Sequence, residues 1–284
     1  MQRIELSTPA IEDMVQASFL KKQQVDPRIT LVGAGPGDPD LISLKGVKAL
    51  KTANVILYDA LVDEQLLAYA PSEAIKVYVG NPSGDENFSQ DVVNQLMVDY
   101  ALNFGHVVRL KGGDLFVFGR GHEELDYAAS YSIEASVVPG ISSAISVPGL
   151  QGIPVTHRGV SNSLWILAGS DDEGNLSEEL KDAAQSRATV VVLLGFNKLP
   201  EIVALYQAAG KGRLPVAAIQ NGSMANEKVA IGIVNTIVEV TEEKQLDNMG
   251  PVLLVFGSAV ELNRQFQPIS RFFQLTACSE HIGE

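Results

Sequence analysis

The chain has 284 residues, of which 46% are hydrophobic and 19% are charged, and its formal net charge is −13 at pH 7. This length allows two domains, and the composition is ordinary for a folded α/β protein and not for a disordered or fibrous one. The acidic balance argues against nucleic acid as a partner, because phosphate binding needs a basic surface. It is compatible with a small anionic ligand, because a local basic pocket can oppose the global sign.

The distribution of residue types excludes further classes of protein. No stretch approaches the roughly 20 apolar residues that a membrane span requires, and residues 1–28 lack the basic start and apolar block of a secretory signal. The single cysteine, Cys278, rules out a disulfide framework, and the widely spread histidines do not form a metal-binding pattern. We therefore expect a cytoplasmic protein without a membrane partner and without a bound metal ion.

Apolar runs alternate with helical patterns through the first half of the chain. The runs predict strands over residues 29–32, 55–59, 75–79 and 134–138, and another that ends before Gly112. Helical spacing of apolar residues predicts helices over residues 41–50 and 89–103, the second capped by Ser89. Such alternation indicates a parallel sheet, whose strands all end at the edge where open α/β sheets bind ligands.

The first strand runs into Gly33-Ala34-Gly35-Pro36-Gly37-Asp38-Pro39, which looks like a dinucleotide-binding fingerprint. That fingerprint needs a third glycine where Asp38 stands, and free N–H groups that face the pyrophosphate. Pro36 has no N–H group, and the carboxylate of Asp38 would repel a phosphate. We therefore expect a strand-end loop that contacts a ligand without phosphates.

The most informative stretch is Arg109–Glu124, in which a strand ends in two glycines followed by Asp114. Glycines at a strand end let a ligand approach the backbone, here beside a carboxylate. An ordinary βα turn with glutamates at the start of its helix is the alternative. Asp59 ends another strand and places a second carboxylate at the same edge, unless it only caps a helix that begins near Asp63.

The pattern changes at residues 152–159, which are the best candidate for a linker between two domains. Beyond it we expect strands over residues 163–168, 189–194, 215–220, 227–232 and 251–257, and helices over residues 176–184 and 199–209. The predicted division is a flexible leader over residues 1–28, an N-terminal α/β domain over residues 29–152, a C-terminal α/β domain over residues 153–268 and a tail over residues 269–284.

Five segments stand out together, and they are Leu31–Pro39, Leu57–Val62, Arg109–Glu124, Val138–Ser143 and Gly152–Arg158. In order and at matching spacing, they resemble motifs of the uroporphyrinogen-III C-methyltransferases, which belong to the tetrapyrrole methylase superfamily. The similarity covers roughly residues 28–266. One such segment is moderately specific, whereas five in register identify a family.

The resemblance implies two α/β domains with mainly parallel sheets and a ligand cleft between them, assembled as a homodimer. It also implies S-adenosylmethionine as methyl donor, S-adenosylhomocysteine as product and a reduced, octa-carboxylate tetrapyrrole as acceptor. Two methyl groups on pyrrole carbons would give precorrin-2, on the way to sirohaem or cobalamin. A sulfonium is already activated, so the protein has to hold a pyrrole carbon in line with the S–CH3 bond, without a metal.

The resemblance also assigns roles to residues of this chain. The positions that match the cofactor contacts of the family are Pro36, Gly112, Gly113, Asp114, Val117, Ser142, Ser143, Leu194 and Gly222. Those that match catalytic positions are Asp59, Asn81 and Arg120, and we expect Arg120, Glu123, His157 and Arg158 to bind the substrate. For Arg120 and Arg158, an ordinary salt bridge to Glu123 or Glu124 is the alternative.

One departure from the family pattern keeps other functions open. The family pairs the aspartate at Asp59 with a lysine, and Asn81 stands at the position of that lysine, followed by Pro82 in place of an arginine. An amide cannot transfer a proton as an ammonium group can. The alternatives are a cofactor-binding paralogue with altered or lost catalysis, a methylase of a related precorrin and, more distantly, a nicotinamide oxidoreductase.

Overall fold

The computed structural model describes residues 25–80, 89–171 and 173–264. The chain divides into two compact units: the first comprises residues up to Ala34 and Ile42–Gly140, and the second comprises Gly35–Leu41 and the chain from Ile141 onward. The two units meet in the sequence after Gly140, earlier than the boundary that we expect at residue 152. That domain boundary and the cleft between the domains stay predictions. No helix among the described residues is both long and apolar enough to cross a membrane.

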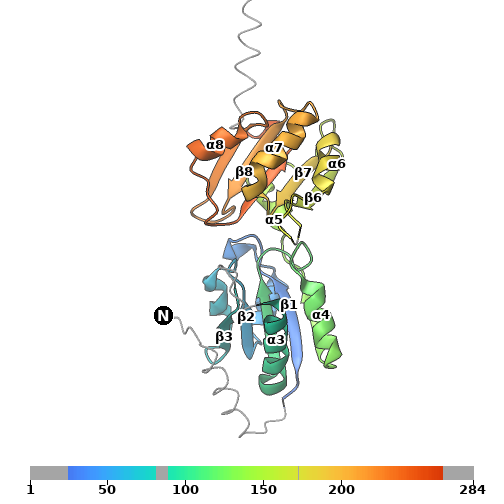
Figure 1. Ribbon diagram of the computed structural model, residues 1–284. Coiled ribbons are helices and arrows are strands. Elements are labelled where there is room, and N and C mark those ends of the chain that lie inside the picture. Colours follow the sequence, from blue (N-terminus) through green and yellow to red (C-terminus); the bar gives the residue numbers. More distant parts are fainter. Residues whose placement is uncertain (1–24, 81–88, 172, 265–284) are drawn as a thin grey trace, which may run out of the picture. The chain divides into compact units, whose positions relative to one another are not determined.

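The first unit is built on a five-stranded, fully parallel sheet with the strand order β3-β2-β4-β1-β5 (Figure 1). Its strands are β1 (Arg28–Gly33), β2 (Val55–Tyr58), β3 (Ile75–Tyr78), β4 (His106–Lys111) and β5 (Glu134–Val138). The sequence predicts them correctly because most are apolar on both faces, as strands of a doubly covered parallel sheet are. Their carboxyl ends therefore share one edge.

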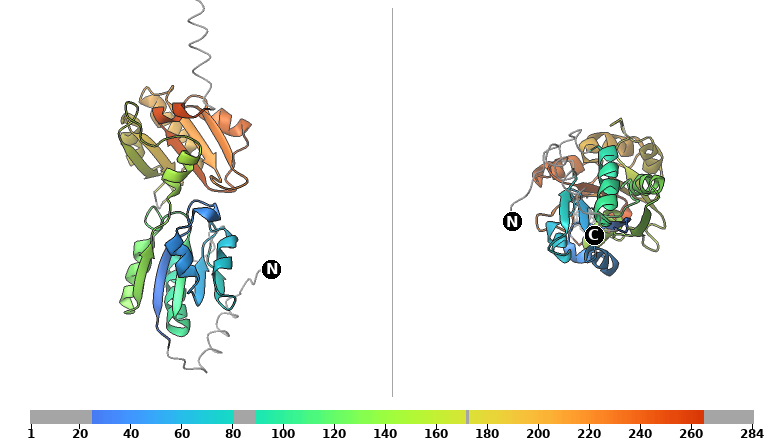
Figure 2. Two further views of the ribbon diagram at one scale, coloured as in Figure 1. Left: turned by 180° about the vertical axis from the view of Figure 1, so that it is seen from behind. Right: turned by 90° about the horizontal axis from the view of Figure 1, so that it is seen from below.

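Helices cover both faces of the first sheet. They are α2 (Leu44–Leu50), η2 (Glu64–Tyr69), α3 (Gln90–Phe104) and α4 (Gly121–Ser130). Buried side chains of α3 and α4, such as Met97 and Ala128, pack with one face of the strands, whereas Leu50 of α2 and Leu66 of η2 pack with the other. The view from behind shows α2 in front of the sheet (Figure 2). Ser89 caps α3 as expected, since its Oγ accepts from the Val92 N–H.

The second unit contains a mixed sheet with the strand order β6-β7-β10-β8-β9. Its strands are β6 (Leu164–Ala168), β7 (Thr189–Leu193), β8 (Pro215–Gln220), β9 (Lys228–Ile233) and β10 (Val252–Phe256). Only the β6–β7 pair is parallel among these strands. Two α/β domains are confirmed, but the second sheet is not mainly parallel. The short connection between β8 and β9 carries no crossover helix, so it can join only antiparallel neighbours.

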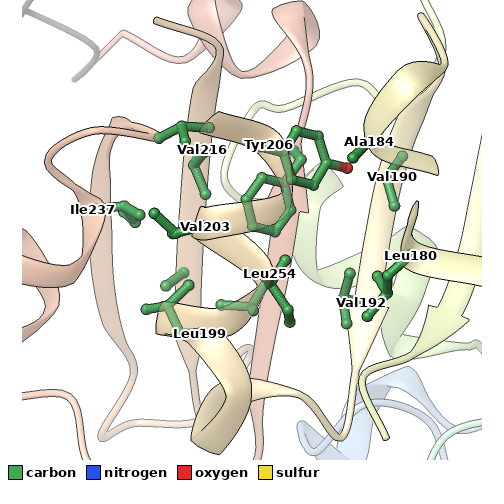
Figure 3. Close-up of a cluster of buried hydrophobic side chains, with 14 of the residues drawn as sticks. Leu180, Ala184, Val190, Val192, Leu199, Val203, Tyr206, Val216, Ile237 and Leu254 are labelled. Carbon is green, nitrogen blue, oxygen red and sulfur yellow. The ribbon is translucent and has the colours of Figure 1, made fainter. Parts of the chain in front are cut away.

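Two layers of helix enclose the second sheet. The helices of this unit are η1 (Pro39–Leu41), α5 (Ser143–Leu150), α6 (Glu179–Gln185), η4 (Phe196–Lys198), α7 (Leu199–Ala208), α8 (Ile237–Glu243) and η5 (Ser258–Leu262). Side chains from α6, α7 and α8 form one core with the sheet, of which Figure 3 shows a part around Tyr206. The ring of Tyr206 stacks on that of Phe256, with ring centroids 4.4 Å apart. On the other face, Ala144 and Val147 of α5 pack beneath β7, β8 and β10.

His106 is a buried histidine in the first unit. Its Nδ1 lies 2.9 Å from the carbonyl oxygen of Thr52, which can only accept, and in the neutral ring the other nitrogen therefore accepts from the Thr30 hydroxyl at 2.9 Å. Burial lowers the pKa of His106 from its usual 6.5, the hydrogen bond to Thr52 opposes that shift, and the charge of Arg28 adds to it. The folded protein therefore takes up this proton at a lower pH than the unfolded chain does.

This shift predicts an acid-sensitive contribution to stability. The unfolded chain binds the proton as the pH falls through about 6.5. The contribution of neutral His106 to the free energy of unfolding should therefore be fully present above that pH and should be lost progressively below it. Urea unfolding between pH 5 and 8 measures the slope, which the His106→Gln variant should lose in part. His157→Gln, which changes an exposed histidine, is the control. Equal slopes for His106→Gln and the parent would contradict the assignment.

Candidate functional site

Three glycines meet at the carboxyl edge of the first sheet. Gly33 ends β1, Gly113 follows β4 and Gly140 follows β5. A Cβ atom on Gly33 would lie 2.5 Å from the Cα of Gly140 and 2.7 Å from the carbonyl oxygen of Gly113, closer than real Cβ contacts. The loops after three adjacent strands therefore pack backbone against backbone, which only glycine permits.

Gly113 combines a special conformation with open space. Its φ is +65°, in the left-handed region that favours glycine, and a Cβ built on it would meet nothing within 4 Å. The neighbouring Gly112 is packed on its own side, where a Cβ would lie 2.7 Å from the Cβ of Leu61. The turn is thus packed against Leu61 at Gly112, whereas the backbone of Gly113 stays accessible to a ligand.

The carboxylate of Asp114 fastens this turn to the next strand end. Its Oδ1 accepts a hydrogen bond from the Phe116 N–H at 2.9 Å, and its Oδ2 accepts from the Gly140 N–H at 3.1 Å. Asp114 therefore ties the loop after β4 to the loop after β5. Its expected position beside a cationic donor stays a proposal, which this geometry allows because the side chain is half-buried at the edge.

The loop after Asp114 exposes large apolar side chains. Phe116 is 53% exposed and Phe118 is 46% exposed, on either side of Val117, whereas Leu115 is fully buried in the core. Phe118 also has a φ of 55°, which is uncommon for a bulky residue. Exposed aromatic groups beside a strained turn are typical of a binding loop.

Asp59 forms an ion pair and does not cap a helix. Its Oδ1 lies 2.5 Å from Nη2 of Arg109 on the adjacent strand β4, while Asp63 caps η2 by accepting from the Gln65 N–H at 2.8 Å. The side chain of Asp59 is 27% exposed and that of Arg109 is 3% exposed. Arg109 thus holds, from within the protein, a carboxylate that reaches the surface of the sheet edge.

Glu124 of α4 is the centre of this buried group of charges. Its Oε1 accepts from Nε of Arg109 at 3.0 Å, from Nζ of Lys111 at 2.8 Å and from the amide of Gln90 at 3.2 Å. Its Oε2 has no hydrogen-bond partner among the described residues. Asp59, Arg109, Glu124 and Lys111 together form what we call the charge quartet, two carboxylates with two cations.

The four groups of the quartet shift the pKa values of the two cations, Arg109 and Lys111. Burial disfavours the charge of Arg109, but Asp59 and Glu124 together outweigh burial and raise the pKa of Arg109. Burial lowers the pKa of Lys111, and the charge of Arg109 lowers it further, while the two carboxylates oppose that shift only in part. Buried charges persist only when they are paired, so the four groups depend on one another.

The sequence pattern does not identify Arg109, Lys111 and Glu124 as a unit. Arg109 and Lys111 are two residues apart in a strand that is otherwise apolar, and such spacing puts two side chains on one face of the sheet. That alternation was a signal for a buried charge cluster. Nothing in the spacing indicated that Glu124, on the following helix, would be their shared partner.

Arg120 pairs with Glu123 at the surface. Its Nη2 lies 2.6 Å from Oε2 of Glu123, with the two side chains 56% and 51% exposed. The hydrogen bond from Arg120 lowers the pKa of Glu123. The salt bridge offered as the alternative for Arg120 is present to Glu123, and the role of Arg120 in substrate binding stays a proposal. An exposed pair of this kind contributes no more than about 1 kcal/mol, so a substrate carboxylate can compete for the arginine.

In the second unit, several candidate cofactor contacts lie near one another. The loop Gly35–Leu41, which contains Pro36, is joined to Ser223 by a hydrogen bond of 3.0 Å from the Asp38 N–H. The preceding residue, Gly222, packs against the side chain of Val147 in α5, with no room for a Cβ. Ser142 caps that helix and accepts from the Ala144 N–H at 3.3 Å, and Ser143 begins it.

The other candidates of the second unit lie on its surface. Leu194, directly after β7, is 66% exposed at a φ of 55°, a strained position for a large apolar residue. His157 and Arg158 are exposed in a turn closed by the hydrogen bond from the His157 N–H to the Ser161 carbonyl oxygen at 2.9 Å. Asn81 and Pro82 lie outside the described residues. Among those described, no group of three or more His, Cys, Asp or Glu residues is placed to hold a metal ion.

Comparison with known proteins places the chain in a family. The sequence profile of the Tetrapyrrole (Corrin/Porphyrin) Methylases matches residues 28–238. The chain is 40% identical over 237 residues to the uroporphyrinogen-III C-methyltransferase of Methanocaldococcus jannaschii, covering 83% of this chain and 97% of that one.

The chain is a tetrapyrrole methylase.

Solved structures of other tetrapyrrole methylases share the fold. The uroporphyrin-III C-methyl transferase of Thermus thermophilus, complexed with S-adenyl homocysteine, is 35% identical with a TM-score of 0.69, over 83% of this chain and 99% of that one. The cobalt precorrin-4 methyltransferase has a TM-score of 0.73 at 23% identity, over 82% of this chain and 95% of that one, which shows the fold alone. Both domains of this methylase therefore have the family architecture.

Among longer relatives, the siroheme synthase of Actinobacillus pleuropneumoniae serotype 7 is 39% identical over 254 residues. The match covers 89% of this chain but 51% of that protein, so the methylase spans about half the length of this relative.

Two adjacent glutamates test the charge quartet. Glu124→Gln leaves the buried cations Arg109 and Lys111 without their shared carboxylate, so it should lower the free energy of unfolding by about 3–5 kcal/mol. Glu123→Gln removes the same charge one residue earlier but only from an exposed pair, and should cost no more than about 1 kcal/mol. Urea unfolding of both variants measures the difference. A similar, small loss in the two variants would show that Glu124 does not stabilise the quartet.

Proposed function

We propose that this tetrapyrrole methylase transfers methyl groups from S-adenosylmethionine to two pyrrole carbons of uroporphyrinogen III and releases precorrin-2. The observation that carries the proposal is 40% identity over nearly the whole length of a relative named uroporphyrinogen-III C-methyltransferase. A second relative of that name, from Priestia megaterium, is equally similar at 40% over 238 residues, with 99% of its length covered. Precorrin-2 is a branch point towards sirohaem and cobalamin, and the match to siroheme synthases fits the same place in porphyrin biosynthesis.

The edge of the first sheet fits a donor of this kind. The open left-handed turn at Gly113 offers backbone groups, and the carboxylate of Asp114 supplies negative charge near a cation. The loop of Pro36 cannot cradle a phosphate, and S-adenosylmethionine carries none. When bound, the donor supplies a methyl group on a positively charged sulfur. The residues proposed to hold it are Pro36, Gly112, Gly113, Asp114, Val117, Ser142, Ser143, Leu194 and Gly222.

Asp59 is the group that we propose to take up the proton that the tetrapyrrole loses. In such a transfer, the π electrons of a pyrrole carbon would form the bond to the methyl carbon while the S–CH3 bond breaks and leaves its electron pair on sulfur, and the now cationic ring system would then lose a proton. The Oδ1 of Asp59 is held by Arg109, whereas its Oδ2 makes no hydrogen bond among the described residues. The carboxylate is therefore anchored by one oxygen and presents the other at the sheet edge.

Surface cations provide recognition of a substrate rich in carboxylates. Arg120, His157 and Arg158 are exposed, and a guanidinium group binds a carboxylate through two parallel hydrogen bonds. We propose that these residues receive the carboxylates of the tetrapyrrole, with Glu123 setting the rotamer of Arg120. Asn81 stands where the family has a lysine, and its part in catalysis is a proposal from sequence alone.

Assembly and location are also proposals. The homodimer follows from the family resemblance, and the cytoplasm follows from the composition of the chain. A cofactor-binding paralogue without turnover, suggested by Asn81 and Pro82, gains no support from the comparisons.

Turnover tests the proposed function directly. Purified protein, incubated anaerobically with S-adenosylmethionine and uroporphyrinogen III, should yield a product that carries two additional methyl groups by mass spectrometry. Binding of S-adenosylmethionine in calorimetry without any gain in the mass of the tetrapyrrole would overturn the proposal and favour the paralogue.

A pair of aspartates tests the role of Asp59. Asp59→Asn keeps the shape of the side chain but removes the proton acceptor, so kcat should fall by about 10²–10⁴-fold with little change in cofactor affinity. Asp63→Asn, four residues later, changes only the cap of η2 and should leave kcat near the parent value. Single-turnover rates of the methylated product measure both. Parent-like rates in Asp59→Asn would show that another group takes up the proton.

A further inference from the structure

A pocket of about 650 Å³ opens in the second unit, at the edge where β7 and β8 begin. It is lined by residues that flank these strands and by the end of α7, among them Arg187, Tyr206, Gln207, Lys211, Arg213 and Asn235. Its volume lies within the range of about 300–1,000 Å³ that is typical of small-molecule sites.

The pocket lies at the opposite edge of the second sheet from the proposed cofactor residues of that unit. Ala188, which lines it, precedes β7, whereas Leu194 follows β7. Leu214 lines it before β8, and Gly222 lies beyond the end of β8. A strand of five or six residues spans about 17–20 Å, so the two edges cannot share one small ligand.

The pocket gathers positive charge in an acidic protein. Arg187, Lys211 and Arg213 line it, no carboxylate residue does so, and the chain as a whole carries a net charge of −13. None of the three cations forms a salt bridge among the described residues, although Lys198 and Arg120 elsewhere do. The ammonium of Lys211 donates to the carbonyl oxygen of Ser186, which fixes it at the wall of the pocket.

The surroundings of Lys211 leave its charge incompletely compensated. Burial lowers the pKa of the Lys211 ammonium, and the neighbouring charge of Arg187 lowers it further. A bound anion would reverse the second of these effects, because an opposite charge nearby favours the protonated lysine. The pocket therefore carries positive charge that no negatively charged group among its lining residues compensates.

From these features we propose that the pocket binds a small organic anion with at least two negative charges on carboxylate or phosphate groups. Arg187 and Arg213 supply planar guanidinium groups for the oxyanions, and Lys211 adds a fixed point charge. The amides of Gln207 and Asn235, joined by a hydrogen bond of 3.1 Å, offer polar contacts, while Val160 and Leu214 provide apolar surface for the body of the ligand. The site does not depend on the proposed methyl transfer.

Calorimetry with defined probes tests the site. Citrate represents an organic carboxylate, ADP an organic phosphate and inorganic phosphate a bare ion, each at the same ionic strength. Citrate or ADP should bind the full-length protein with one site per chain. The double variant Arg187→Gln/Arg213→Gln should weaken that binding at least about tenfold, since each arginine donates charge-assisted hydrogen bonds. Both arginines are exposed, so the fold should be retained, as circular dichroism can verify.

Matched controls separate the pocket from general electrostatics. Lys181→Gln/Lys244→Gln removes the same two charges from exposed positions that do not line the pocket, and should leave citrate or ADP binding unchanged. Saturating S-adenosylmethionine should not displace the anion. The proposal is overturned if neither organic probe binds at millimolar concentration, if only inorganic phosphate binds, if both double variants weaken binding equally, or if S-adenosylmethionine competes.

Discussion

The candidate site at the carboxyl edge of the first sheet depends on the buried pairing of Arg109 with Glu124. A charged guanidinium that is 3% exposed is costly to bury without a carboxylate, and Glu124 provides one from a different element. Once held there, Arg109 has a second face for Asp59, whose carboxylate reaches the surface. The chain thus uses charges that burial would otherwise destabilise to fix the direction of one accessible carboxylate.

Backbone packing determines how the loops at the carboxyl edge of the first sheet are arranged. The mutual contact of Gly33, Gly113 and Gly140 brings the ends of three strands together, and Asp114 locks two of these loops through their N–H groups. Rigid strand ends can hold a ligand in one orientation, and methyl transfer from an already activated donor depends on orientation above all. The same residues therefore explain the fold of the edge and its suitability for this chemistry.

The sequence alone predicted the strands because buried parallel strands are continuous apolar runs that need no knowledge of their partners. It did not predict α5, whose Pro148 and apolar surface give no amphipathic pattern, or the antiparallel part of the second sheet. The charge quartet was also missed, because Glu124 meets Lys111 only after a helix folds back onto its strand. Recognition of Asp59 and Asp114 came from motifs, whereas their hydrogen-bond partners came from the structure.

We propose that the open turn after β4, next to the anchored Asp59, holds the methyl donor. A crystal of the protein soaked with S-adenosylhomocysteine would show where the donor binds. We expect density for that molecule against the backbone of Gly113 and beside Asp114. Density for S-adenosylhomocysteine only elsewhere, with this turn free of ligand, would contradict it.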